Sequence, residues 1–533
     1  MYGSAPPGLY IKRRCPRPRS GGILREMRNR ALITISSICG LAAAAGCGGP
    51  RTPAGPGYPL PPECVVLEGP SEMADTVRIA LSGRVDPAHA PVPRGDSERM
   101  LFGSLYETLI KADCGGGVHP GLASEWYEGD GGRRWTFRLR SDARFWDGSP
   151  VTAGSVAACW QSAGVEPFIW EAGVDSVAAA GETTLHVYLA DPSDEVPLEL
   201  SGPPFAVAAA GPAYRWPQGS SPYRIAEEQM WLSVTRHGPI TVTPVRRKEG
   251  PVLLFREPAS PGAGDARDLL EAEADVMVTG DPDVIEYAVS RPHLEAVPLP
   301  WSRKYILLST TRVLGIRLGD RLPGFGRDFT DALARDTVPR VSRGHEESAW
   351  WKSLDSCGNE AESRGRNVSA ASLASMPEPG ERLRIIYDRE DPVARGLAER
   401  IVGLGAAGPD GPPAAAQLEA AVPGLAKDPG VLSAAGVSEE ELKAGLAKGD
   451  QFAYIIWIPL DPAGPCRETG RLIERAFWLS RLGGRLDEAI LPLVDTRRYA
   501  ILRKGTAGLS IDWSGDIRIT GAQPRPAAPM AGR

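Results

Sequence analysis

The residue types that usually carry catalysis are scarce and scattered in this chain. Six histidines are spread over 533 residues, and none lies at metal-ligand spacing from another. The sequence has no GxSxG, no GxxxxGK[ST], no HExxH and no GxGxxG that follows a strand. The carboxylates at 439–441 open a predicted helix, where negative charge stabilises the N-terminal end. We therefore expect no catalytic residues and no enzyme activity.

Cysteine spacing argues against a metal centre as well. The eight cysteines contain no CxxC pair and no Cys/His cluster, so we expect no zinc site, no other metal and no cofactor. Two cysteines precede a predicted cleavage point and one lies at it. The remaining five allow one or two disulfides without indicating a pairing: Cys64, Cys114, Cys159, Cys357 and Cys466.

The N-terminus has the composition of a secretory signal. Basic residues follow Met27, residues 31–45 form a short apolar run, and Cys47 follows Ala-Gly. The run is shorter than the roughly 20 residues that cross a bilayer. Cys47 resembles the lipidated cysteine of bacterial lipoproteins, although Ala44 stands where their pattern prefers Leu. We expect a signal peptide over 1–46, with translation starting at Met1 or Met27, and lipidation of Cys47; simple secretion is the alternative.

Composition and charge limit what the rest of the chain can be. Length favours two or three folding units, and the net charge of -6 argues against nucleic acid as a partner. Gly and Pro dominate residues 47–75, which we interpret as a tether, and residues 523–533 as a disordered tail.

Between these ends the hydrophobic pattern predicts alternating strands and helices. We expect strands at 76–81, 135–140, 305–308, 383–388 and 452–458, and helices at 99–110, 329–335 and 394–402. Residues 266–290 predict helix, strand, turn and helix. Residues 145–152 predict a tight turn at Asp147-Gly148, followed by a helix that Thr152 caps. Ser438 and Glu441 form a capping box.

Several of these segments resemble the family 5 extracellular solute-binding proteins, which serve ABC importers. The resemblance is carried by Leu105-Tyr106-Glu107, by Gly121-Leu122-Ala123 with Trp126, and by the stretch FWDGSPVT at 145–152. It extends thinly through 219–225 and 275–278 to the terminal strand pair at 490–512. The family implies an α/β, two-lobed clamshell (type II) with an extra subdomain in lobe one. Lobe one would comprise 76–303 with 487–522, and lobe two 304–486.

The resemblance also implies where a ligand would bind. In peptide-binding relatives, a strand late in lobe two carries a Trp and then an Asp that pairs with the peptide's α-amine. Here Trp457 is followed by Leu460 and Asp461, so Asp461 either pairs with an amine or is only a turn residue. Trp457 is either a cleft wall or core packing. Tyr305 and Trp301, near the predicted crossing between lobes, complete the ligand-binding candidates.

The expected function follows from the family. We expect a monomeric, lipid-anchored periplasmic protein that captures a small molecule, by default a peptide, for an inner-membrane ABC permease. One alternative is a binding-fold protein without a transport role, acting as an envelope sensor or scaffold. A secreted hydrolase is the other, but the sequence offers it no nucleophile.

Overall fold

The computed structural model describes most of residues 64–309 and several later segments. The described ranges are 64–68, 75–309, 340–344, 383–406, 432–449, 453–460, 490–519 and the single residues 472 and 476; short gaps fall at 163, 167–168, 170–171, 210–214, 232–237, 246–249, 259–264, 273 and 507–508. The predicted signal, Cys47, the helix expected at 329–335 and Asp461 lie outside these residues.

The main sheet is mixed and contains 11 strands within the described residues, in the order β16-β15-β17-β13-β18-β12-β2-β11-β10-β9, with β14 beside β18. Its strands are β2 (Thr76–Ala80), β9 (Tyr223–Ile225), β10 (Ile240–Pro244), β11 (Val252–Arg256), β12 (Val276–Thr279), β13 (Leu294–Ser309), β14 (Ser342–Gly344), β15 (Leu383–Asp388), β16 (Leu432–Val437), β17 (Ala453–Pro459) and β18 (Ile490–Arg503).

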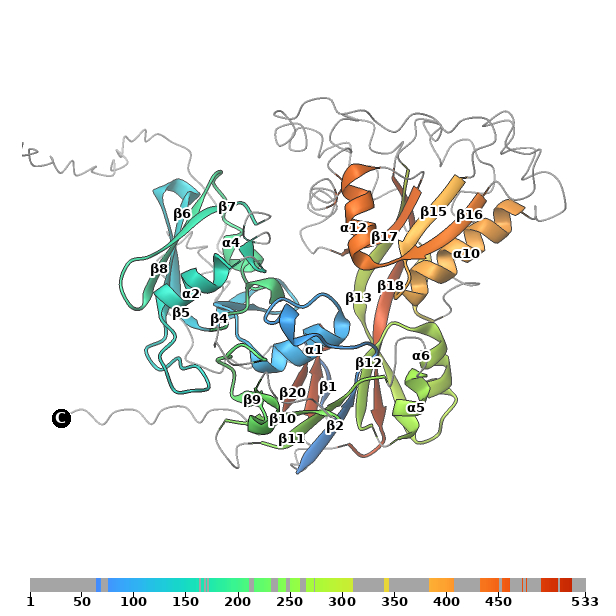
Figure 1. Cartoon of the computed structure of the whole chain (residues 1–533), viewed down its shortest axis with the longest axis horizontal. Coiled ribbons are helices and arrows are strands. Elements are labelled where there is room, and N and C mark those ends of the chain that lie inside the picture. The colour runs from blue at the N-terminus through green and yellow to red at the C-terminus, as the bar shows by residue number, and fades with distance from the viewer. Residues whose placement is uncertain are drawn as a thin grey trace, which may run out of the picture. The chain divides into compact units, whose positions relative to one another are not determined.

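Two long antiparallel strands, β13 and β18, connect the two halves of this sheet (Figure 1). The C-terminal part of β18 pairs with β12 on its far side, and the C-terminal part of β13 pairs with β17. The pairing of β13 with β18 shifts register at three places, between 298 and 301, between 301 and 303, and between 305 and 306. Such irregularities bend and twist a ladder, so the two strands change direction where they pass from one half to the other.

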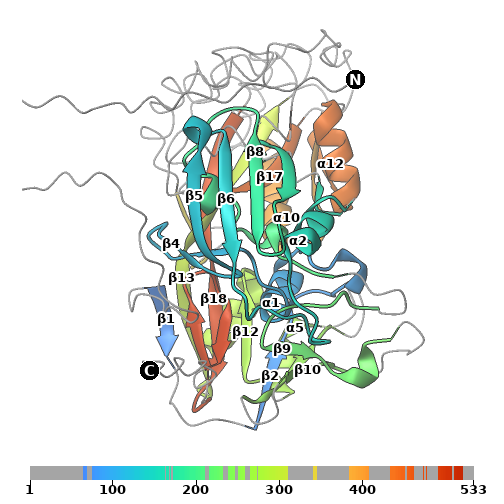
Figure 2. The same ribbon diagram turned by 90° about the vertical axis from the view of Figure 1, so that its left-hand side faces the viewer.

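Three smaller sheets complete the strands. One contains β1 (Val65–Glu68), β19 (Leu509–Asp512) and β20 (Ile517–Ile519), and another pairs β3 (Ile110–Ala112) with β4 (Val118–Pro120). The third has the order β5-β6-β8-β7 and comprises β5 (Ala123–Gly129), β6 (Arg134–Leu139), β7 (Val174–Ala179) and β8 (Thr184–Leu189). Helix α2 packs against β7 and β8 of this sheet (Figure 2).

Several of the helices begin at a residue whose side chain caps them. The helices of the described residues are α1 (Asp96–Leu105), α2 (Ala153–Trp160), α4 (Val196–Glu199), α5 (Ala266–Glu271), α6 (Pro282–Val289), α10 (Pro392–Ala406) and α12 (Glu439–Lys448). Thr152 forms a capping box with Ser155 at α2, and Ser438 forms the predicted one with Glu441 at α12. No helix among the described residues is both long and apolar enough to cross a bilayer.

The buried side chains form three clusters. The first is built around α1, α2, β2 and the β5–β8 sheet. The second lies between helices α5, α6 and α10 and strands β12, β13, β17 and β18. The third lies on the other face of β15 and β17, under α12. Figure 1 shows α10 and α12 beside β15, β16 and β17. Residues of α10 belong to the second cluster and residues of α12 to the third.

Most of the predicted elements that fall within the described residues are confirmed. The strand pattern at 135–140 is β6, with Trp135, Phe137 and Leu139 buried on one face. The helix expected over 99–110 instead spans Asp96–Leu105. It ends early because the following backbone is extended and closely packed: a Cβ at Gly121 would lie 2.4 Å from the carbonyl oxygen of Thr108.

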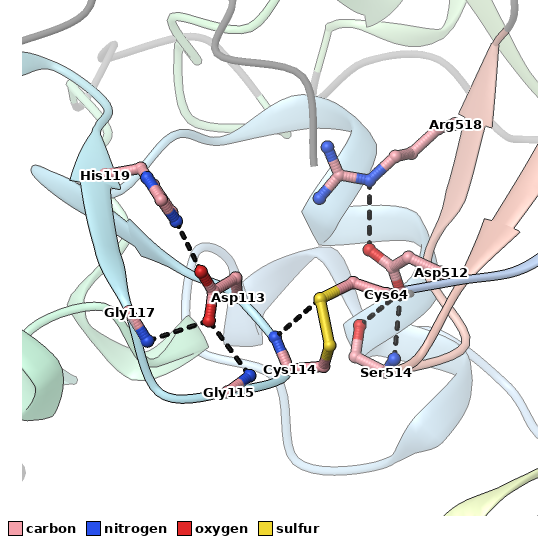
Figure 3. Close-up of a disulfide and its surroundings, with 9 residues drawn as sticks. All are labelled: Cys64, Asp113, Cys114, Gly115, Gly117, His119, Asp512, Ser514 and Arg518. Carbon is pink, nitrogen blue, oxygen red and sulfur yellow. Dashed lines mark hydrogen bonds and ion pairs between the residues drawn. A yellow bond between two sulfur atoms is a disulfide. The ribbon is translucent and has the colours of Figure 1, made fainter. Parts of the chain in front are cut away.

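The predicted tether is too long at its C-terminal end. Residues 65–68 form β1, which pairs with β19, and Cys64 forms a disulfide with Cys114 (Figure 3). The apolar run at 65–67 lies within a Gly/Pro-rich segment, which concealed its strand character. The disulfide is the pairing that the sequence left open. Among the other described cysteines, Cys159 is buried as a free thiol.

Candidate functional site

Trp457 and Tyr305 are brought together by strand pairing. They are directly opposite each other in the antiparallel ladder of β13 and β17. Trp457 is partly buried and packs on the second cluster, whereas Tyr305 is 1% exposed within it. The two predicted aromatic residues therefore occupy one place in the fold, with Trp457 the more accessible.

Arg303 covers the ring of Trp457. Its guanidinium carbon lies 4.3 Å from the ring centroid, a cation–π distance. Its Nη2 donates to both carboxylate oxygens of Asp96, at 2.6 and 2.7 Å. Asp96 is the first residue of α1, so this ion pair joins a helix of the first cluster to strand β13.

A second arginine shares the same carboxylate. Arg498, on β18, donates from Nη1 to Asp96 Oδ1 at 3.3 Å and from Nη2 to the carbonyl oxygen of Ser514. Burial opposes ionisation of Asp96, but Arg303 and Arg498 outweigh it and hold the pKa of this carboxyl well below its usual range. We call Asp96, Arg303 and Arg498 the arginine clasp; its formal charge is plus one.

The hydroxyl of Tyr305 donates a hydrogen bond to a buried carboxylate, that of Asp391. It donates to Asp391 Oδ2 at 2.8 Å, and Asp391 Oδ1 accepts the backbone N–H groups of Val393 and Ala394 at the start of α10. Burial raises the pKa of Asp391 even though these hydrogen bonds oppose the shift. Burial, together with Asp391, also raises the pKa of Tyr305 well above its ordinary value.

Trp301 lies in a separate contact set. The guanidinium carbons of Arg343 and Arg497 are each 4.6 Å from its ring centroid, and Arg343 pairs with Asp495 at 3.2 Å. Trp301 is opposite Arg497 on β18, next to two of the register shifts. The structure thus brings Trp457 and Tyr305 together and leaves Trp301 with other partners.

The four ligand-binding assignments remain predictions after these placements, and Asp461 lies outside the described residues. Sequence reasoning missed Asp96, Arg303, Arg498 and Asp391. A lone Arg in a strand and an Asp at a helix start have no local signal, because their pairing depends on contacts 207 and 402 residues apart in sequence. The proximity of Arg303 to the predicted Tyr305 was the only available hint.

The arrangement is suited to noncovalent binding. A half-buried indole, a stacked guanidinium and a fixed carboxylate offer stacking surface and charged hydrogen-bond groups. Among the residues that the structure describes, no group of three or more His, Cys, Asp or Glu side chains could hold a metal ion.

Comparison with known proteins gives a partial sequence match. Residues 117–235 match the family described as bacterial extracellular solute-binding proteins, family 5 Middle. The periplasmic murein peptide-binding protein MppA of Escherichia coli is 35% identical over 97 residues, which are 17% of each chain. The probable deoxycholate-binding periplasmic protein YgiS of the same organism is 35% identical over 122 residues, 20% of this chain and 23% of that protein. These matches therefore span less than a quarter of either relative.

Solved structures resemble the chain over most of its length. NikA from Brucella suis in complex with Fe(III)-EDTA has a TM-score of 0.54 at 14% identity, covering 85% of this chain and 99% of that one. OppA from Haemophilus influenzae in complex with the peptide RPPGFSPFR has a TM-score of 0.53 at 14% identity, covering 85% and 98%. At this identity the likeness establishes the fold, which is the two-lobed α/β fold of these binding proteins.

Proposed function

We propose that this chain, whose residues 117–235 match the family 5 extracellular solute-binding proteins and whose fold is that of NikA and OppA, binds a small solute and delivers it unchanged to an ABC permease. The observation that carries the proposal is the sequence match at 117–235 within a fold that covers nearly the whole of its structural neighbours. Relatives named for binding murein peptide and oligopeptides make a peptide the proposed ligand.

The proposal assigns the binding event to the second half of the main sheet, around Trp457. Support comes from Trp457, which is half-buried beside the strands that join both halves of the sheet, and from the charged groups gathered over it. Sites between structural units commonly bind small molecules, because groups from both sides can surround the ligand. Ligand binding would shift the protein toward a conformation that the permease recognises.

The location of the protein is part of the proposal. The matched relatives are named as periplasmic proteins. We place this chain in the cell envelope as a monomer, held to a membrane by lipid on Cys47. Intact-mass analysis of protein from the native membrane tests the anchor: a diacylglyceryl mass on a chain beginning at Cys47 supports it. Unmodified protein that is released without detergent contradicts it.

Binding is tested by thermal unfolding of the purified protein with a mixture of di- to pentapeptides. A ligand that binds only the folded state at 100 times its Kd stabilises that state by about 2.7 kcal/mol. A rise in Tm with peptides supports the proposal. No rise with peptides but a rise with another solute class would retain the binding function and reject peptide as the ligand.

A further inference from the structure

Arg303 is held in place from two sides while part of its guanidinium remains unused. Trp457 lies under the guanidinium at 4.3 Å, and Asp96 takes two hydrogen bonds from Nη2 alone. The side chain of Arg303 is 19% exposed. A guanidinium has five N–H donors. Within the described part of the chain, neither Nη1 nor Nε of Arg303 has a hydrogen-bond partner.

The second arginine of the clasp is differently placed. Arg498 is 9% exposed at its side chain, and its Nε is sealed from solvent without a partner. Its Nη groups are used by Asp96 and by the carbonyl oxygen of Ser514. Of the two cations, Arg303 therefore has the more exposed side chain, and its unused donors are the ones that a solute can reach.

The charge balance around Arg303 favours an incoming anion. Asp96 is shared by two arginines, so the clasp has a formal charge of plus one. Asp516, a further carboxylate, acts on Arg498 and not on Arg303. Asp391 also acts on Arg303, but its oxygens are hydrogen-bonded to Tyr305 and to the start of α10, and burial raises its pKa and so disfavours its charge. A partly buried cation with unused donors is stabilised by an anionic partner.

We propose that Arg303 is a ligand-binding residue that receives a carboxylate of the solute, with Trp457 as the platform beneath it and Asp96 as its positioning residue. Carboxylate is the planar anion that matches a guanidinium fork. Because Asp96 and Trp457 already fix the side chain, its ordering costs little on binding. The inference rests on the proposed function and refines it: the ligand class is a peptide or related solute with a free carboxylate.

The test uses matched peptide mixtures and the full-length mature protein. Wild type is titrated with tripeptides that have a free C-terminus, with the same tripeptides amidated, and with amidated tripeptides containing Glu. We expect free acids to bind about 10–100-fold more tightly than neutral amides, the range for one or two charge-assisted hydrogen bonds. Amidated Glu peptides that bind like free acids would identify a side-chain carboxylate as the group; if they bind like amides, it is the C-terminus.

Variants assign the preference to one arginine. Arg303→Gln is expected to bind acids and amides alike. Arg303→Lys keeps the charge but lacks the guanidinium fork, so its preference for acids over amides should be at least about threefold smaller than that of wild type. Arg291→Gln is the matched control, since Arg291 also lies 4.3 Å over an aromatic ring, that of Tyr287, and pairs with Glu271 at 3.7 Å. It should keep the full preference.

The failures are distinguishable. If wild type binds neither mixture, peptide binding is rejected and the inference falls with it. If wild type binds acids and amides equally, or if either folded Arg303 variant keeps the wild-type ratio, the proposed function stands and the role of Arg303 is overturned.

Discussion

Replacing Asp96 by Asn should destabilise the fold far more than a typical surface charge change. The substitution removes the carboxylate that accepts from both Arg303 and Arg498 and leaves two cations facing each other. Side-chain exposures of 23%, 19% and 9% for Asp96, Arg303 and Arg498 place the group between surface and interior. Breaking a buried ion pair costs about 3–5 kcal/mol and an exposed one about 0–1. We expect a loss of about 3 kcal/mol.

Urea unfolding at pH 7 measures this loss, with Asp130→Asn as the control. Asp130 also pairs with an arginine, Arg134, at 3.2 Å, but the two side chains are 61% and 36% exposed. The control should lose no more than about 1 kcal/mol. Equal losses in the two variants would refute the reasoning, because they would show that the clasp contributes no more than a surface pair.

Asp96 also makes the free energy of unfolding depend on pH in a direction that can be stated in advance. The folded-state pKa of Asp96 is lowered, so its contribution to stability is complete above the unfolded value near 4 and is lost as the pH falls below it. Wild type should therefore lose the advantage over Asp96→Asn on acidification from pH 5 toward pH 2. A difference between the two proteins that is constant over this range would contradict the assigned charge.

Three further predictions concern other parts of the fold. Burial, with the nearby Asp512, raises the pKa of Asp516 to about 6; stability from this group should fall as the pH rises from about 4 to 6, and Asp516→Asn should abolish that fall in pH-dependent unfolding. Removing the Cys64–Cys114 disulfide by double Ser substitution opens a loop of 50 residues and should cost about 4 kcal/mol in urea unfolding; a loss under 1 kcal/mol would contradict this. Ser438→Ala removes the cap of α12 and should cost about 1 kcal/mol, whereas an unchanged midpoint would show that the cap is dispensable.

Local patterns predicted the elements well where their cause is local. The cap at Thr152 and the capping box at Ser438 depend on residues three apart, and the structure confirms both. The turn at Asp147-Gly148 is confirmed by Gly148, whose φ of 87° favours glycine. The helix end at Leu105 was missed because it is set by the packing of 106–123, which no short window contains.

Features that depend on distant contacts were not predictable. β13 extends from Leu294, well before the predicted strand at 305, because its first half pairs with β18. Trp457 and Tyr305 were selected by resemblance, and their direct pairing adds a geometric reason to group them. Arg303 acquires its importance only when α1 supplies Asp96 and β17 supplies Trp457.

Native mass spectrometry tests most directly the claim that the protein binds a solute and leaves it unchanged. The mature protein is purified from its own cells, its mass is measured in the folded state, and the protein is then denatured to release and identify the solute. We expect a folded complex that carries an additional small mass, and release of that solute chemically intact on unfolding. Protein that carries no added mass, and that gains none with peptides or with any other solute class tested, would contradict the account. So would a solute that is recovered as a converted product.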